Sequence, residues 1–312
     1  MAAAGTEQQL AWEARQRPRA AAAAILAAVL TFGADVFSGS VFRDAPRSGF
    51  LDALSSAGRP GPAGSQPSLR SGFFEFYDSH RAELLGSSIA RAIGLVALGW
   101  ALTFLVAAVR SRREGLPRIA MPLALIGALL SAISTLLGAF ASSSAVTNFL
   151  SGPRTVDAAR DVTGGTTLVT AQFIGLAGQL ALATGFVLVS LNAMRAGLLT
   201  RFMGILGVIV GALVVIPIGP VQVVQPFWLF ALGILFAGFW PGGRPPAWRT
   251  GQAEPWPSQK EVAAARRDQA EARQGARRGD PPADPDATRE PVGAPTGSPG
   301  PGARKRKRKR RD

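Results

Sequence analysis

The chain has 312 residues, of which 47% are hydrophobic, and a formal net charge of +14 at pH 7. Residues 242–312 contain almost no apolar run, so the preceding part is far more apolar than a soluble domain, which indicates a membrane protein. The absence of Cys and the presence of a single His and a single Tyr exclude disulfides, thiolate metal sites and sites that need paired imidazoles, so we expect no metal and no cofactor.

Six stretches are long and apolar enough to cross a hydrocarbon core about 30 Å thick. They lie near residues 20–41, 88–109, 119–143, 167–192, 202–220 and 222–241. We therefore expect an all-α, polytopic transmembrane helical bundle over residues 19–241, after a cytoplasmic segment at 1–18. The basic start of the first stretch also fits a secretory signal peptide. However, the apolar run is longer than a typical signal core and lacks a clear cleavage site, so we expect a retained span.

The loops between these stretches predict the orientation of the chain. "RSRREGLPR" between the second and third stretches carries four Arg against one Glu, and "RAGLLTR" between the fourth and fifth carries two Arg and no acid. The opposite loops, near 42–87 and 144–166, are nearly balanced in charge. Because cytoplasmic loops are enriched in Lys and Arg, the two basic loops are expected inside, and both termini with them.

Two charged residues fall inside predicted spans, where charges normally face the bundle interior or a wet cavity. Asp35 lies toward the outer end of the first span and Arg91 toward the outer start of the second, so the two are at similar depth and can pair. The alternative is that each reaches the nearby interface separately.

Amide side chains extend this polar set toward an outward-facing pocket. Gln172 and Gln179 are seven residues apart and share a helix face, while Gln222 and Gln225 open the sixth span at the outer side. Pro residues around them interrupt the turn between the fifth and sixth spans and free backbone carbonyls. Ordinary hydrogen bonding between helices explains the same residues with fewer coincidences.

The first external loop, 42–87, has two parts. "GRPGPAGSQPS" has the composition of a flexible linker, and "FFEFYDSHRAELLGSSIAR" is expected to form an amphipathic helix that runs into the second span. Its aromatic residues would rest on the membrane surface or cover the polar pocket; they are Phe73, Phe74, Phe76 and Tyr77.

Small residues and Trp predict how the spans pack and where they end. Gly207 and Gly211 have the spacing that lets helices approach closely, which favours packing within one subunit over dimerisation. The third span has small residues on one face at Gly127, Ser131, Ser134 and Gly138. Membrane-interface anchoring is the expected role of Trp228, Trp240, Trp248 and Trp256.

Residues 242–312 are rich in Pro, Gly, Ala and charge, which predicts a disordered cytoplasmic tail with a short polar helix at 258–275. The tail ends in a basic run of eight residues, Arg304, Lys305, Arg306, Lys307, Arg308, Lys309, Arg310 and Arg311. Near the inner leaflet this run is expected to contact anionic lipid or an acidic protein; the alternative is a simple solvated charge run that reinforces the topology. The same positive charges could also attract nucleic acid, but the sequence predicts no nucleic-acid recognition fold.

From residue 195 the chain reads "RAGLLTRFMGILGVIVGAL" and then "FWLFALGILFAGFWPGGRPPAWRTGQAEPWPS". With the earlier "SGPRTVDAARD" loop, these segments resemble a family of uncharacterised, about six-span membrane proteins from actinobacteria. The resemblance covers roughly residues 20–257. It implies a multi-pass topology and a location in the bacterial cytoplasmic membrane, and it implies no activity, substrate or catalytic residue.

The spans also lack the residues of common membrane chemistry. An intramembrane protease needs a Ser with a His, or paired Asp residues, and the spans contain no His and a single Asp. No phosphate-binding Gly-Lys-Ser/Thr motif is present. We therefore expect a non-enzymatic membrane protein that uses its basic tail, and the alternative is a small-solute or ion transporter that uses the outward polar cluster.

Overall fold

A computed structural model describes most of the chain. The described residues are 2–47, 49, 62–113, 115–216, 223–241, 243–254, 263–264, 267–270 and 273. Two compact units are distinguished, Met1–Trp256 and Pro257–Asp312. Within the second unit the described residues are helical, in line with the short helix expected at 258–275. The basic run at 304–311 and the expected disorder of the tail lie outside the described residues.

Helices dominate the described part of the first unit, which contains no strand beyond an isolated bridge between Pro67 and Thr155. The elements are α1 (Ala2–Arg43), η1 (Ala63–Ser65), α3 (Ser71–Ser79), α4 (Arg81–Arg110), α5 (Ala120–Ser151), α6 (Val156–Gly164), α7 (Thr166–Arg195), α8 (Arg201–Val215), α9 (Val224–Ala237) and α10 (Ala247–Thr250). The expected all-α fold is thereby confirmed.

Four helical segments in the described residues are long and apolar enough to cross a membrane, and they correspond to the first four predicted spans. The last two predicted spans contain shorter apolar helices, α8 and α9. These have 15 and 14 residues, or about 22 Å each at 1.5 Å per residue. Residues 217–222, which join them, lie outside the described part.

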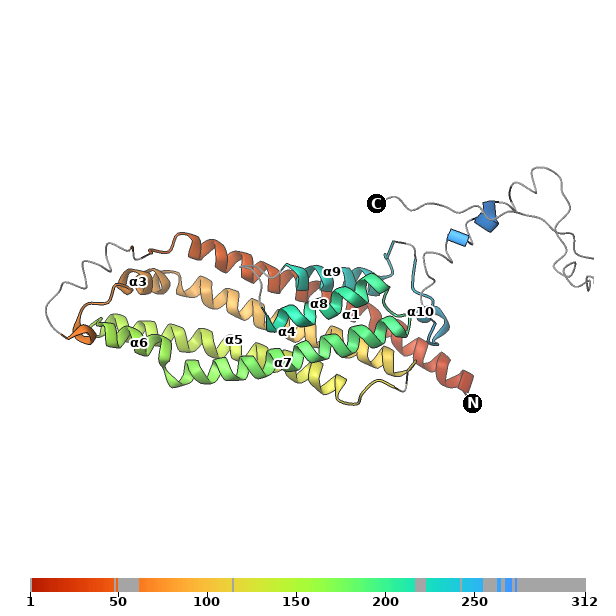
Figure 1. Ribbon diagram of the computed structural model, residues 1–312, viewed down its shortest axis with the longest axis horizontal. Coiled ribbons are helices and arrows are strands. Elements are labelled where there is room, and N and C mark those ends of the chain that lie inside the picture. Colours follow the sequence, from red (N-terminus) through yellow and green to blue (C-terminus); the bar gives the residue numbers. More distant parts are fainter. Residues whose placement is uncertain are drawn as a thin grey trace, which may run out of the picture. The chain divides into compact units, whose positions relative to one another are not determined.

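The helices of the first unit run between two ends (Figure 1). We call one the basic end; it carries the start of α1, the α4–α5 loop, the α7–α8 turn and α10. The other, the distal end, carries α3 and α6. In Figure 1, α8 and α9 lie beside the half of the bundle nearer the basic end. Helix α9 packs on α1, and α8 packs on α7.

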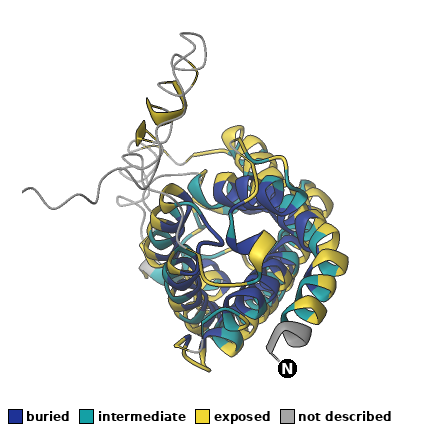
Figure 2. Cartoon of the chain, turned by 90° about the vertical axis from the view of Figure 1, so that its right-hand side faces the viewer, coloured by how far each residue is buried: buried dark blue, intermediate teal, exposed yellow. Residues whose placement is uncertain are grey.

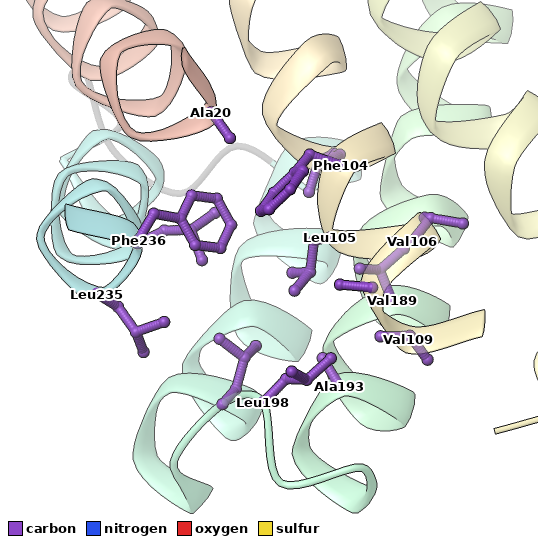
Figure 3. Packing of buried hydrophobic residues seen from close by; sticks show 14 of the residues in the cluster. Ala20, Phe104, Leu105, Val106, Val109, Val189, Ala193, Leu198, Leu235 and Phe236 are labelled. Carbon is purple, nitrogen blue, oxygen red and sulfur yellow. The ribbon is translucent and has the colours of Figure 1, made fainter. Parts of the chain in front are cut away.

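The core follows from the helix pattern. Buried residues line the inward faces of the helices and exposed residues lie outside, as the end-on view of Figure 2 shows. At the basic end, Phe104 of α4 meets Phe236 of α9 edge to face, with ring centroids 5.1 Å apart (Figure 3). Large apolar side chains also cover the outer surface, among them Trp100, Phe173 and Phe202, each more than half exposed. Such an outer surface is suited to lipid rather than water.

Small residues let α5 and α7 approach closely. A Cβ on Gly127 would lie 2.5 Å from the backbone nitrogen of Leu182, and one on Gly178 would lie 2.7 Å from that of Ser131. Ser134 donates a hydrogen bond to the carbonyl of Ala171 at 2.8 Å. The small-residue face predicted for the third span is therefore an intrachain helix contact.

Gly207 and Gly211 pack α8 against α7 within the same chain, as expected. A Cβ on Gly207 would clash with Ser190, and one on Gly211 would lie 2.9 Å from the carbonyl oxygen of Ala183. The preceding turn has a local explanation. Gly197 has a left-handed φ of 75°, and the Thr200 hydroxyl caps α8 by accepting a hydrogen bond from the Met203 amide at 3.2 Å.

Three aromatic expectations are wrong. Trp228 is fully buried and donates a hydrogen bond to the carbonyl of Met203 at 2.8 Å, and Trp248 is buried and donates to the carbonyl of Leu198 at 3.0 Å. Both rings are therefore parts of the protein core and not exposed interfacial anchors. Phe74 is buried in a cluster between α3, α5 and α6 instead of resting on a surface. Trp240 is half-buried, and Trp256 lies outside the described residues.

Candidate functional site

The expected pair between the first two spans is present. Arg91 of α4 donates a hydrogen bond to Asp35 of α1, and both side chains are partly exposed near the distal end. One helical turn further toward that end, the hydroxyls of Ser38 and Ser87 are 2.9 Å apart and bridge the same two helices. The residues thus form a short polar seam between α1 and α4.

The wider polar pocket is not assembled. Gln172 and Gln179 both lie on the exposed face of α7, away from the core of the bundle. Gln225, near the start of α9, is half-buried, and no hydrogen bond joins it to Asp35 or Arg91. Gln222 lies outside the described residues. The prediction was wrong for α7 because seven-residue spacing shows that two residues share a face and leaves open which face that is.

A second ion pair, which the sequence did not suggest, joins α1 to the α4–α5 loop at the basic end. Arg112 donates to both carboxylate oxygens of Glu13, at 2.5 and 2.8 Å, and both side chains are fully buried. Arg112 also donates to the carbonyls of Ala108 and Ala247, at 2.8 and 3.0 Å. A buried guanidinium with this many partners is fixed in position.

Trp248 of α10 lies beside this pair and contacts two cations. The guanidinium carbons of Arg112 and Arg17 are 5.3 and 4.9 Å from the centroid of its ring. Such distances are those of cation–π contacts. The Nε of Arg17 is nevertheless buried without a hydrogen-bond partner in the described part of the chain. We call Glu13, Arg17, Arg112, Arg244 and Trp248 the basic-end cluster, because the charge of Arg244 also acts on Arg17.

The distal end is closed by α3 and α6. Phe74 stacks edge to face on Phe149 of α5 at 4.7 Å, and Arg154 donates to Glu75 at 2.7 Å between exposed side chains. A pocket of about 380 Å³ opens here beside Arg70 and Arg160. The His80 ring contacts the carbonyl of Phe76 and the hydroxyl of Ser79, both at 3.0 Å, so it takes part in local bonding at the α3–α4 junction.

The two ion pairs on α1 and α4 are separated by about one bilayer thickness. Glu13 and Asp35 are 22 residues apart on α1, and Arg91 and Arg112 are 21 residues apart. At 1.5 Å per residue these separations are about 33 and 32 Å. A hydrocarbon core is about 30 Å thick. The two pairs therefore lie near opposite ends of the bundle, about one hydrocarbon thickness apart.

Charge is distributed unevenly between these boundaries. Among the described residues of the first unit, the basic end has eleven Arg against three Glu: Arg15, Arg17, Arg19, Arg110, Arg112, Arg113, Arg118, Arg195, Arg201, Arg244 and Arg249, with Glu7, Glu13 and Glu254. The distal end has seven of each sign: Arg43, Arg47, Arg70, Arg81, Arg91, Arg154 and Arg160, with Asp35, Asp44, Glu75, Asp78, Glu83, Asp157 and Asp161.

Comparison with known proteins gives no match. No protein-family model matches the chain, and no similar protein was found among curated proteins or among solved structures. The functional argument therefore depends on the chain's own residues, namely four helices long and apolar enough to cross a membrane, two ion pairs at opposite ends of the bundle and one strongly basic end.

Proposed function

We propose that the chain is a non-enzymatic, multi-pass protein of the bacterial cytoplasmic membrane whose basic tail, 304–311, binds anionic lipid at the inner leaflet. The observation that carries this proposal is the charge asymmetry of the described residues of the bundle, eleven Arg to three Glu at one end and seven of each sign at the other. Excess Arg near span ends favours the cytoplasmic side. The resemblance to actinobacterial multi-pass proteins is consistent with this location.

The proposed topology has six crossings, with α8 and α9 as parts of the last two. Each of these two helices is about 22 Å long, which is shorter than a full crossing of the hydrocarbon core. If α8 and α9 instead turn back within the membrane, four crossings remain. Both counts are even and leave the two termini on the cytoplasmic side, so the position of the tail does not depend on the choice.

Anionic lipid is the favoured partner because it lies within reach of a tail tethered to the inner face. Each basic residue near such a surface gains about 1 kcal/mol, and the attraction weakens within a Debye length. An acidic protein would be recognised by the same charges. The transporter alternative loses its support, since Gln172 and Gln179 do not join Asp35 and Arg91; no second function is proposed.

A peptide of residues 290–312 tests the proposal. It is expected to sediment with vesicles that contain phosphatidylglycerol and to be released by high salt, whereas vesicles of phosphatidylcholine alone leave it in solution. The control peptide has Gln in place of every basic residue from 304 to 311. Binding that is insensitive to salt, or equal for the two peptides, would contradict lipid binding by the tail. If the peptide bound an acidic protein in preference to the vesicles, the proposed partner would be that protein and not anionic lipid.

A further inference from the structure

Positive charge is in excess in the basic-end cluster. Arg112 occupies both oxygens of Glu13, and in the described part of the chain the charges of Arg112, Arg244 and Glu13 all act on Arg17. Arg17 donates no hydrogen bond to any described residue, although its Nε is buried. A buried donor without an acceptor is costly, and native structures normally supply one.

Local packing fixes the position of each of the two guanidinium groups, and the charge of Arg244 acts on Arg17. The Trp248 ring lies under Arg17 at 4.9 Å. Arg244 lies against the backbone of Gly238, where a Cβ would come within 2.6 Å of its Nε. Gly238 ends α9 with a left-handed φ of 89°, so the absence of a side chain serves both the helix end and the approach of Arg244. Arg244 is exposed, which leaves the site open to a ligand.

The depth of the site is that of lipid headgroups. Arg17 is one helical turn from Glu13 and directly precedes the apolar run of α1 that begins at Ala20, so it lies at the inner end of the first predicted span. Lipid phosphates lie directly outside the hydrocarbon core. A planar guanidinium group can donate two parallel hydrogen bonds to two oxygens of one phosphate, a geometry that Arg provides and Lys does not.

We propose that Arg17 and Arg244 bind the phosphate of one anionic phospholipid at the inner surface of the bundle, beside Trp248. The bound phosphate supplies the acceptor that Arg17 lacks and offsets the repulsion between the two cations. The proposal depends on the membrane placement argued above. It does not depend on the tail, because both residues belong to the first unit.

Native mass spectrometry of the full chain in detergent tests the site. With phosphatidylglycerol, the wild-type protein is expected to retain one lipid more tightly than the rest and to prefer it to phosphatidylcholine. Arg17→Gln with Arg244→Gln should weaken this first binding event about tenfold or more, because charge-assisted bonds to phosphate are lost. The matched control, Arg19→Gln with Arg249→Gln, removes the same charge from exposed positions at the same end and should leave the event unchanged.

Three further measurements make the result decisive. Gln substitutions throughout 304–311 should abolish tail binding and leave the first lipid in place, which separates this site from the proposed tail function. Arg17→Lys, which keeps the charge, should weaken binding less than Arg17→Gln and checks for a folding defect. Inorganic phosphate should not displace the lipid. Equal losses in the double variant and its control, no preference for the anionic lipid, or displacement by inorganic phosphate would overturn the proposal.

Discussion

At the scale of single residues, the main difference from expectation is a buried ion pair in a segment that was expected to lie outside the bundle. Glu13 lies within residues 1–18, which contain several charges and were expected to lie outside the bundle. Helix α1 instead starts at Ala2 and brings Glu13 onto Arg112. Sequence spacing along one helix cannot show this contact, because it depends on the register between α1 and α4.

Glu13→Ala should destabilise the bundle by about 3 to 5 kcal/mol, since it leaves Arg112 buried with an uncompensated charge. Thermal unfolding in detergent micelles, followed by circular dichroism, measures the loss as a lower midpoint. Glu7→Ala is the control, because Glu7 is exposed, and it should change little. A variant that carries both Glu13→Leu and Arg112→Met should recover most of the lost stability. An unchanged midpoint in Glu13→Ala would contradict the buried pair.

Trp228 makes a second prediction at this scale. Trp228→Phe removes the donor to the Met203 carbonyl in a fully buried place and should lower the free energy of unfolding by about 1 to 3 kcal/mol. The matched change Trp100→Phe, on a ring that is 56% exposed, should have an effect within about 0.5 kcal/mol. If Trp228 were an interfacial anchor, as its sequence position suggested, the two substitutions would have similar small effects.

At the scale of elements, the sequence predicted the helices better than their boundaries and contacts. The segment from Phe73 to Arg91 was expected to form one amphipathic helix, but two helices meet at His80, whose backbone leaves the helical region at φ −106° and ψ 16°. The break lets α3 turn its Phe74 into the cluster with α5 and α6. Tertiary packing of one aromatic side chain thus overrides a favourable local pattern.

Gly127 tests the close contact between α5 and α7. Gly127→Ala would place a Cβ 2.5 Å from the backbone of Leu182, which cannot move without displacing α7, so the variant should be less stable by about 1 to 3 kcal/mol. Gly86→Ala is the matched control: nothing lies within 4 Å of its Cβ position, and loss of a helical Gly should stabilise α4 by about 0.5 to 1 kcal/mol. Opposite signs are expected in the same thermal assay. If Gly127→Ala left the stability unchanged, α5 and α7 would have to lie farther apart than they do in this structure.

At the scale of the whole molecule, hydrophobic length sufficed to predict the four long apolar helices, and the two basic loops lie at one end of the bundle, as their charge suggested. These properties are sums over many residues, so errors at single positions average out. The basic-end cluster could not be predicted in this way, because it brings together residues from α1, the α4–α5 loop and the segment after α9. The prediction of the outward pocket was wrong for the same reason. The sequence indicates the depth of a residue along a span, but it does not indicate the rotation of the helix about its axis.

Topology is the last prediction, and the absence of native Cys makes it direct, because every label reports one introduced residue. Ser151→Cys, exposed at the distal end, should react with a membrane-impermeant maleimide in intact bacterial cells, and Thr250→Cys, exposed at the basic end, only after lysis. Ile218→Cys then decides the span count: external labelling means six crossings, and protection in intact cells means that α8 and α9 turn back before the outer surface. Labelling of Thr250→Cys in intact cells would reverse the orientation and place the basic tail away from the inner leaflet, because an even number of crossings keeps both ends of the chain on one side.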